Sequence, residues 1–182
     1  DDDFMLARYL VNGQLDPAFG TGGLVTAVFQ SGVGAARAVA IAPSGELFVA
    51  GHSNHHFAVA EFSSSGAVSP PLNKAIVQLS QGNKDEEEAI ALDGDRVIVA
   101  GWAHEGTSQA GNFALVRLLP DGTLDTSFGG GRVITPMGAS GANDQAMAMA
   151  LQADDRIPTV RAVVAGYATD TNLDFAVARF WR

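Results

Sequence analysis

The sequence predicts an all-β protein made of repeated four-stranded antiparallel sheets, and three observations support this fold class. A motif that starts with Phe and reaches a turn glycine nine residues later recurs along the chain. Segments in which alanine alternates with larger apolar residues recur with a similar period, and turn signals such as Pro-Asp-Gly separate the segments. Four-stranded sheets that repeat at this period and are buried on both faces are typical of β-propeller blades.

The Phe motif is the first element of the repeat and is present four times. It begins at Phe4, Phe57, Phe113 and Phe175, with spacings of 53, 56 and 62 residues. Its apolar residues alternate with others, as in HFAVAEF and NFALVRL, which predicts a strand. Fixed self-similarity at this period indicates a repeat architecture rather than a single irregular domain.

Two further elements precede each later copy of the Phe motif. Alternating alanine strands lie at 38–42, 89–92 and 146–151. Apolar strands that contain a Val-Ala-Gly triplet follow them at 46–53, 96–103 and 161–168. Alternation without polar residues predicts strands that are buried on both faces, and the alanine face allows a neighbouring sheet to approach closely.

These elements predict a single repeat domain, 1–182, with three four-stranded blades at 23–65, 74–119 and 131–181. An orphan outer strand at 3–11 precedes them. A β-solenoid is the alternative, although its coils are usually shorter and lack four strands per repeat. Propellers typically close with about four to eight blades. We therefore expect another copy of the chain, or missing blades of a longer chain, to complete the ring.

Composition excludes several classes of function. The chain of 182 residues is 47% hydrophobic and can bury a core, while its net charge of −9 with 11 Lys and Arg disfavours nucleic acid and anionic membrane surfaces as partners. The absence of Cys excludes disulfides, thiolate metal sites and a cysteine nucleophile. The apolar runs are too short for membrane insertion. The chain begins with Asp1 rather than Met, so we expect a processed or excised piece without its signal peptide.

The stretch PDGTLDTSFGGGRVIT at 120–135, with VAGYA and DFAVARF further along the chain, resembles the delta-60 repeat, a bacterial propeller-like repeat of about this period. The LDxSFG core is intact at 124–129, reads LDPAFG at 15–20, and is altered in the middle copy at 68–73. The resemblance implies a bacterial protein that is secreted or attached to the cell surface. It brings no catalytic residues with it.

Comparison of the copies predicts a structural pair of charged residues. Arg and Asp stand eight residues apart in two copies, Arg8 with Asp16 and Arg117 with Asp125. The middle copy has Glu61 and Ser69 at these places, so Arg and Asp are replaced together. This predicts an ion pair or charge-assisted hydrogen bond that fixes the following Phe-Gly turn. A carboxylate site is the alternative interpretation.

A calcium site is the candidate for metal binding. Asp170, Asn172 and Asp174 place three oxygen ligands at alternate positions, as loops that bind hard cations do. The glycine that such a loop needs after its third ligand is replaced by Phe175. The alternative is a solvated loop at the start of a strand.

Other polar residues indicate no specific chemistry. The four histidines, His52, His55, His56 and His104, are not expected to form a metal site, because the neighbours His55 and His56 would point to opposite faces of a strand. The acidic run KDEEE at 84–88 is expected to be a charged outer loop. The chain also lacks a GxSxG nucleophile motif and a phosphate-binding GK[ST] motif.

The sequence therefore favours a non-enzymatic β-propeller repeat module, an extracellular or surface scaffold that presents loops to a protein or glycan. No cofactor is expected, with calcium as the one candidate. One alternative function is a propeller-type hydrolase or lyase with a metal near the ring axis. Another is a calcium-stabilised adhesion segment. Fold alone does not decide between these functions.

Overall fold

The structure is a computed structural model that describes residues 4–29, 33–80, 84–104, 110–139, 142–153, 160–169 and 172–180. These residues form thirteen strands and one 3-10 turn, η1 (Gly129–Gly131). The strands are β1 (Phe4–Ala7), β2 (Leu24–Ala27), β3 (Gly34–Ile41), β4 (Leu47–Ser53), β5 (His56–Phe62), β6 (Lys74–Val77), β7 (Asp85–Asp93), β8 (Arg96–His104), β9 (Gly111–Leu118), β10 (Arg132–Thr135), β11 (Gln145–Ala153), β12 (Val160–Thr169) and β13 (Leu173–Phe180). The predicted all-β class is confirmed. No helix in the described ranges is long and apolar enough to cross a membrane.

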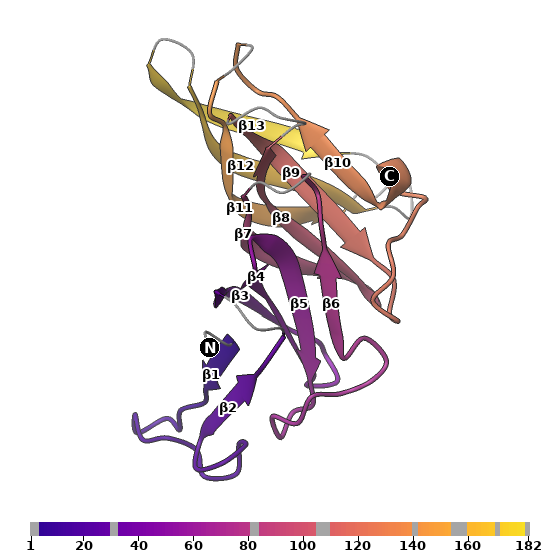
Figure 1. The fold of residues 1–182 in the computed structure, drawn as a ribbon. Helices are drawn as coiled ribbons and strands as arrows, with labels where there is room; N and C mark the ends of the chain where they lie inside the picture. Colours follow the sequence, from indigo (N-terminus) through magenta and orange to yellow (C-terminus); the bar gives the residue numbers. More distant parts are fainter. Residues whose placement is uncertain are drawn as a thin grey trace.

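The strands form four antiparallel sheets that follow one another along the chain (Figure 1). β1 and β2 form a two-stranded sheet, β3–β6 and β7–β10 form four-stranded sheets, and β11–β13 form a three-stranded sheet. In each sheet, hydrogen-bonded neighbours are also neighbours in sequence, so every sheet is a simple meander. The alanine strands β3, β7 and β11 are the first strands of their sheets.

The sheets group the strands differently from the expected blades. The predicted blades 23–65, 74–119 and 131–181 each start one strand too early, because β2, β6 and β10 pair with the strand before them. The predicted orphan strand at 3–11 is not alone, since β1 pairs with β2. The reason is the Phe-Gly turn, which returns the chain to the strand that it has just left. In the first copy, the amide of Arg8 donates to the carbonyl of Gly23 at 3.0 Å.

A β-bulge interrupts each alanine strand opposite the glycine of the Val-Ala-Gly triplet. At the bulge of β7, a Cβ on Gly101 would lie 2.1 Å from the carbonyl oxygen of Glu86. The corresponding approaches at Gly51 and Gly166 are 2.0 and 1.9 Å. No side chain fits at such distances, so glycine is required where the bulged backbone crosses.

Packing between successive sheets forms the core. Phe57 of β5 shares one hydrophobic cluster with Val99 of β8 in the next sheet. Phe113 of β9 shares another with Val164 of β12, again in the next sheet. The phenylalanine that begins each motif therefore packs against the sheet that follows it.

Exposure of the motif phenylalanines follows from this packing. Phe4, Phe57 and Phe113 are at most 1% exposed, because each has a following sheet. Phe175 of β13 is 81% exposed. Among the described residues, no sheet follows β13.

Candidate functional site

Both Arg–Asp pairs are present as ion pairs at the Phe-Gly turns. Arg8 Nε donates to Asp16 Oδ2 at 2.8 Å, and its guanidinium lies 4.7 Å from the ring centroid of Phe19. The Asp16 carboxylate also accepts the amide of Ala18 at 2.9 Å. The pair thus connects the strand, the turn backbone and the turn phenylalanine, as charge-assisted bonds and cation–π contacts do.

The second pair is more deeply buried than the first. Arg117 Nε lies 2.9 Å from Asp125 Oδ2, and these side chains are 2% and 7% exposed, against 36% and 17% for Arg8 and Asp16. Arg96 Nε approaches the same oxygen at 3.1 Å. Hydrogen bonds from Ser127, with the charge of Arg117, hold the pKa of Asp125 below its usual value.

The middle copy keeps the turn with a different carboxylate. Glu61, at the position of the arginines, is 3% exposed and accepts the amide of Leu72 through Oε2 at 2.9 Å. Leu72 takes the place of the turn phenylalanine and is also buried. The joint loss of Arg and Asp is therefore compensated by one acidic side chain that binds the turn backbone directly.

Two buried aspartates connect successive sheets, and neither was predicted from the sequence. Asp85 Oδ2 accepts the amides of Leu79 and Ser80 at 2.9 and 3.0 Å. Asp144 Oδ2 accepts the amides of Met137 and Gly138 at 2.7 and 2.9 Å. Each aspartate stands two residues before the residue that pairs with the glycine of the Val-Ala-Gly triplet, Glu87 with Gly101 and Ala146 with Gly166, and this shared position was the available signal.

The prediction of an outer loop at 84–88 was wrong, because the four acidic residues of the run, 85–88, belong to strand β7. Asp85 and Glu87 are fully buried, while Glu86 and Glu88 are partly exposed. Along this part of β7, buried acidic residues alternate with partly exposed ones, because the strand enters the interface between two sheets. Acidic residues that are neighbours in the sequence therefore lie in different environments.

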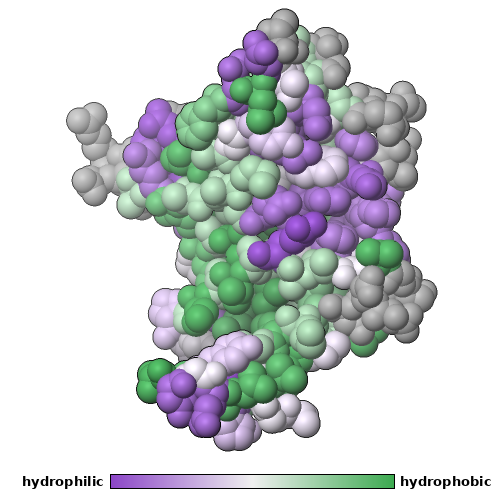
Figure 2. Space-filling model, turned by 90° about the vertical axis from the view of Figure 1, so that its left-hand side faces the viewer, coloured by the Kyte–Doolittle hydropathy of each residue, from purple (hydrophilic) through white to green (hydrophobic). Residues whose placement is uncertain are grey.

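Polar side chains gather where β3 and β7 begin and β4 and β8 end. We call this cluster the histidine end; it comprises Arg37, His52, His55, His56, Asp85, Glu86, Glu87, Trp102 and His104. Arg37 Nη2 lies 3.6 Å from Glu86 Oε2, which joins β3 to β7. His56 Nδ1 lies 3.7 Å from Asp85 Oδ2. On the face drawn in Figure 2, hydrophobic residues gather in the lower half and hydrophilic residues lie above them.

The rings of the histidine end differ in burial. His52 and His104 are 6% and 7% exposed, and burial lowers the pKa of each, so both are neutral at pH 7. Trp102 contacts His104 with ring centroids 5.4 Å apart. His55 lies in the turn between β4 and β5, is exposed, and stacks on His52 with centroids 6.5 Å apart.

Burial of the Glu87 carboxyl group at the histidine end costs stability. It is fully buried between sheets, and neither carboxyl oxygen has a well-formed hydrogen bond within the described residues. Burial raises the pKa of Glu87 well above its usual value, although the amides of Glu87 and Ala58 oppose this shift. A buried acid with a raised pKa is a candidate functional group.

The calcium candidate lies partly outside the described residues. Asp170 lies outside the described residues, and Asn172 and Asp174 are exposed. Across the described ranges, no three His, Asp or Glu side chains converge as metal ligands would. The calcium site at 170–174 stays a prediction.

One comparison with known proteins found a family model that matches part of the chain. Residues 95–128 match a family model described as "Domain of unknown function (DUF5122) beta-propeller". The chain carries a β-propeller-type repeat. The matched stretch contains β8, β9 and the Arg117–Asp125 turn. A comparison with curated proteins gave no match.

The buried Arg–Asp pair predicts a pH-dependent loss of stability. Asp125→Asn leaves the buried Arg117 without its anionic partner, so we expect the free energy of unfolding to fall by about 3 kcal/mol. The matched Asp16→Asn change, at the more exposed pair, should cost about 1 kcal/mol or less. Urea unfolding at pH 7 measures both. Equal losses would contradict the role of burial.

The contribution of Asp125 to the free energy of unfolding depends on pH in a definite direction. The pKa of Asp125 is lowered on folding, so its contribution is complete above the unfolded pKa of about 3.9 and is lost as pH falls through the lowered value. The difference between wild type and Asp125→Asn should therefore be full at neutral pH and shrink under acid conditions.

The buried Glu87 should make stability depend on pH in the opposite direction. Its raised pKa means that folding retains a proton, so stability falls as pH rises from the unfolded pKa of about 4.3. We expect Glu87→Gln to be more stable than wild type by more than about 1 kcal/mol at pH 7.5, with the gap closing near pH 4. Glu88→Gln, at the partly exposed neighbour, is the control. A difference in stability between wild type and Glu87→Gln that does not depend on pH would contradict the burial of an ionised Glu87.

Proposed function

We propose that this chain is a segment of a non-enzymatic β-propeller built from delta-60-type repeats, in which each sheet is one blade. We further propose that it serves as a secreted or cell-surface bacterial scaffold that presents loops to a protein or glycan. The propeller-type family match and the LDxSFG cores support the repeat type. The meander sheets packed face to face agree with blades.

The observation that carries the scaffold proposal is how the repeated residues are used. The motif phenylalanines, the alanine strands and the glycine triplets serve packing between and within sheets. The repeated charges bind turn backbone or one another. Residues that recur in every copy thus build the framework. Residues that do not recur are the ones left to determine binding specificity.

The histidine end is the proposed binding surface because its exposed groups are not repeated. Arg37, His55 and Glu86 reach solvent there. By strand register, Arg37 is replaced by Glu88 and Met147 in the other sheets, and Glu86 by Ala35 and Gln145. A guanidinium, a carboxylate and an imidazole together offer hydrogen bonds to sugar hydroxyls and acids. An acidic glycan is the ligand class that Arg37 favours.

Two alternatives keep specific support. The buried Glu87 favours a hydrolase or lyase as the second candidate, because a carboxyl group with a raised pKa can act as a general acid. The oxygen ligands at 170–174 favour a calcium-stabilised adhesion segment as the third.

A glycan array probed with the wild-type chain tests the proposal. We expect binding to acidic glycans that weakens by at least about tenfold in the Arg37→Ala/His55→Ala variant, which is about 1.4 kcal/mol. Arg132→Ala, an exposed arginine at the opposite end of the sheets, is the matched control and should bind as wild type.

The same experiment separates the alternatives. The array is repeated with calcium chloride and with EDTA, and the chain is incubated with a panel of lactones. If EDTA abolishes binding and lowers the melting temperature, the result would favour the adhesion segment instead. Lactone hydrolysis that is lost in Glu87→Gln would overturn the non-enzymatic proposal.

A further inference from the structure

A pocket of about 360 Å³ lies between the turn ends of the sheets β3–β6 and β7–β10. Three carboxylates line it, and we call it the acidic pocket: Glu46 directly before β4, Glu61 of β5, and Asp95 in the β7–β8 turn. Among the described residues, no Lys, Arg or His lines this pocket. A pocket of this size that carries one sign of charge indicates a binding site for a group of the opposite charge.

Glu61 supplies a buried carboxylate without a countercharge. The residue is 3% exposed, and its Oε2 accepts the amide of Leu72 at 2.9 Å. Within the part of the chain that the structure describes, the other oxygen, Oε1, accepts no hydrogen bond and no cationic side chain pairs with the carboxylate. Burial of a carboxylate costs free energy unless a cation compensates it. The unpaired oxygen of Glu61 therefore indicates a cationic ligand.

Glu46 adds a second carboxylate to the acidic pocket. The Ser44 hydroxyl donates to Glu46 Oε2. This hydrogen bond, together with the amide of Glu46, holds the pKa of the carboxyl group below its usual value, so Glu46 is ionised at neutral pH. Asp95 Oδ1 lies 3.7 Å from Arg96 Nη1, so the charge of Asp95 is partly compensated. Glu46 and Glu61 form no ion pair among the described residues and are the two carboxylates that can bind a cation.

The next sheet shows what kind of cation occupies the equivalent place. By strand register, Arg96 stands at the position of Glu46, and Arg117 at that of Glu61. Both guanidinium groups bind Asp125, with their Nε atoms 3.1 and 2.9 Å from Oδ2. The sheet β3–β6 thus has two carboxylates where the next sheet has two guanidinium groups.

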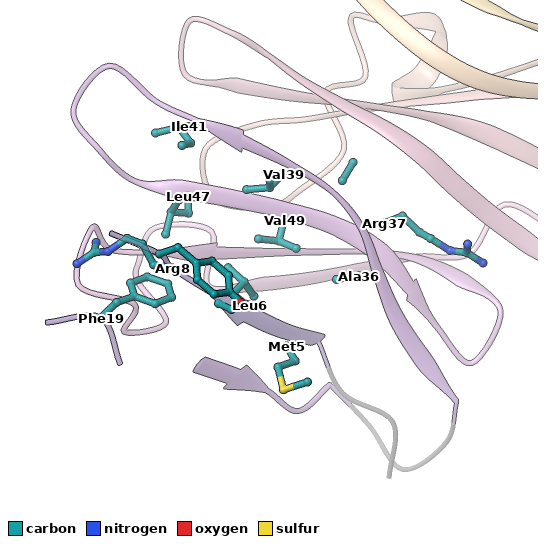
Figure 3. Close-up of a pocket in the computed structure, with 13 residues that line it drawn as sticks. Met5, Leu6, Arg8, Phe19, Ala36, Arg37, Val39, Ile41, Leu47 and Val49 are labelled. Carbon is teal, nitrogen blue, oxygen red and sulfur yellow. The ribbon is translucent and has the colours of Figure 1, made fainter. Parts of the chain in front are cut away.

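The first copy also has a guanidinium at this place. Figure 3 shows Arg8 beside the ring of Phe19, and the guanidinium lies 4.7 Å from the ring centroid. The guanidinium of Arg117 lies at the same distance, 4.7 Å, from the ring centroid of Phe128. In both copies the guanidinium binds a carboxylate and packs over an aromatic ring, and the chain supplies it from its own sequence.

The acidic pocket has both kinds of contact but no guanidinium of its own. Phe48, Pro70 and Pro71 line it together with the carboxylates, and the two prolines are exposed, so a partner can reach it. A guanidinium is planar and weakly hydrated, and it packs against aromatic and apolar surfaces while its N–H groups bind carboxylates. An ammonium group is a strongly hydrated point charge and gains less from such walls.

We propose that the acidic pocket binds the arginine side chain of a partner protein, with Glu46 and Glu61 Oε1 accepting the hydrogen bonds of its guanidinium. The ligand class is an exposed peptide segment that contains arginine. The pocket lies at the end of the sheets opposite the histidine end. This site is therefore additional to the proposed binding of acidic glycans and does not depend on it.

An NMR titration of the isotope-labelled chain with the peptide Gly-Arg-Gly tests the proposal. The reporters are the amides of Leu72, which Glu61 binds, and of Gly94, which lines the pocket. In about 0.15 M salt, which screens charges beyond about 8 Å, we expect both amides to shift with a dissociation constant of about 1 mM or lower. The same peptide with citrulline, the neutral isostere, should bind at least about tenfold more weakly. Gly-Lys-Gly should also bind more weakly than Gly-Arg-Gly.

Variants distinguish the pocket from the overall negative charge of the chain. Glu46→Gln should weaken the binding of Gly-Arg-Gly at least about tenfold. Glu88→Gln removes the same charge from a glutamate outside the pocket that is also partly exposed, and it should bind as wild type. Glu61→Arg/Ser69→Asp recreates in the middle copy the ion pair of Arg117 and Asp125. We expect this variant to keep the circular dichroism spectrum of wild type and to lose the peptide-induced shift of Gly94.

Equal affinity for the arginine and citrulline peptides, or equal effects of Glu46→Gln and Glu88→Gln, would overturn the proposal. Unshifted reporters up to about 10 mM Gly-Arg-Gly, ten times the expected constant, would overturn it as well. Equal affinity for Gly-Lys-Gly would contradict the assignment to arginine. If Glu61→Arg/Ser69→Asp does not fold, the pair Glu46→Gln and Glu88→Gln still decides, because both positions are partly exposed.

Discussion

Each sheet of this protein is apolar on both faces, and the rest of the structure depends on this constraint. The central sheet β7–β10 contributes one face to the cluster of Val99 and the other face to the cluster of Phe113. A sheet of this kind is most stable when a neighbouring sheet covers each of its faces. Burial of a phenylalanine contributes about 2–3 kcal/mol, which makes each motif phenylalanine a principal contact between successive sheets.

Polar residues are placed so that this packing stays regular. Asp85 and Asp144 bind the backbone between one sheet and the next, and so fix where each alanine strand begins. Asp125 and Glu61 bind the turn that returns the chain to its own sheet. Different side chains thus bind neighbouring amides of the turn in different copies, that of Ser127 in one and that of Leu72, at the position after the equivalent residue, in the other. The turn geometry is kept, and the sequence around it varies.

The sequence predicted the strands and the charged pairs because both are local or repeat with a fixed spacing. It did not predict where each sheet starts. In a tandem four-strand repeat, every starting strand gives the same pattern, and only the hydrogen bonds that join β1 to β2 resolve the choice. The histidine end was also beyond prediction, because its residues come from five strands and one turn, and the register of these strands is set by tertiary pairing. Glu87 was assigned to a loop because a run of acids is usually solvated, whereas β7 buries every second residue at its start.

The central claim is that contact with a following sheet stabilises each sheet, and one matched pair of variants tests it most directly. Phe113→Ala and Phe175→Ala remove the same side chain from equivalent strand positions, one buried beneath the next sheet and one 81% exposed. Urea unfolding should show a loss of about 3–5 kcal/mol for Phe113→Ala and of about 0.5 kcal/mol or less for Phe175→Ala. Equal losses from the two variants would contradict the account.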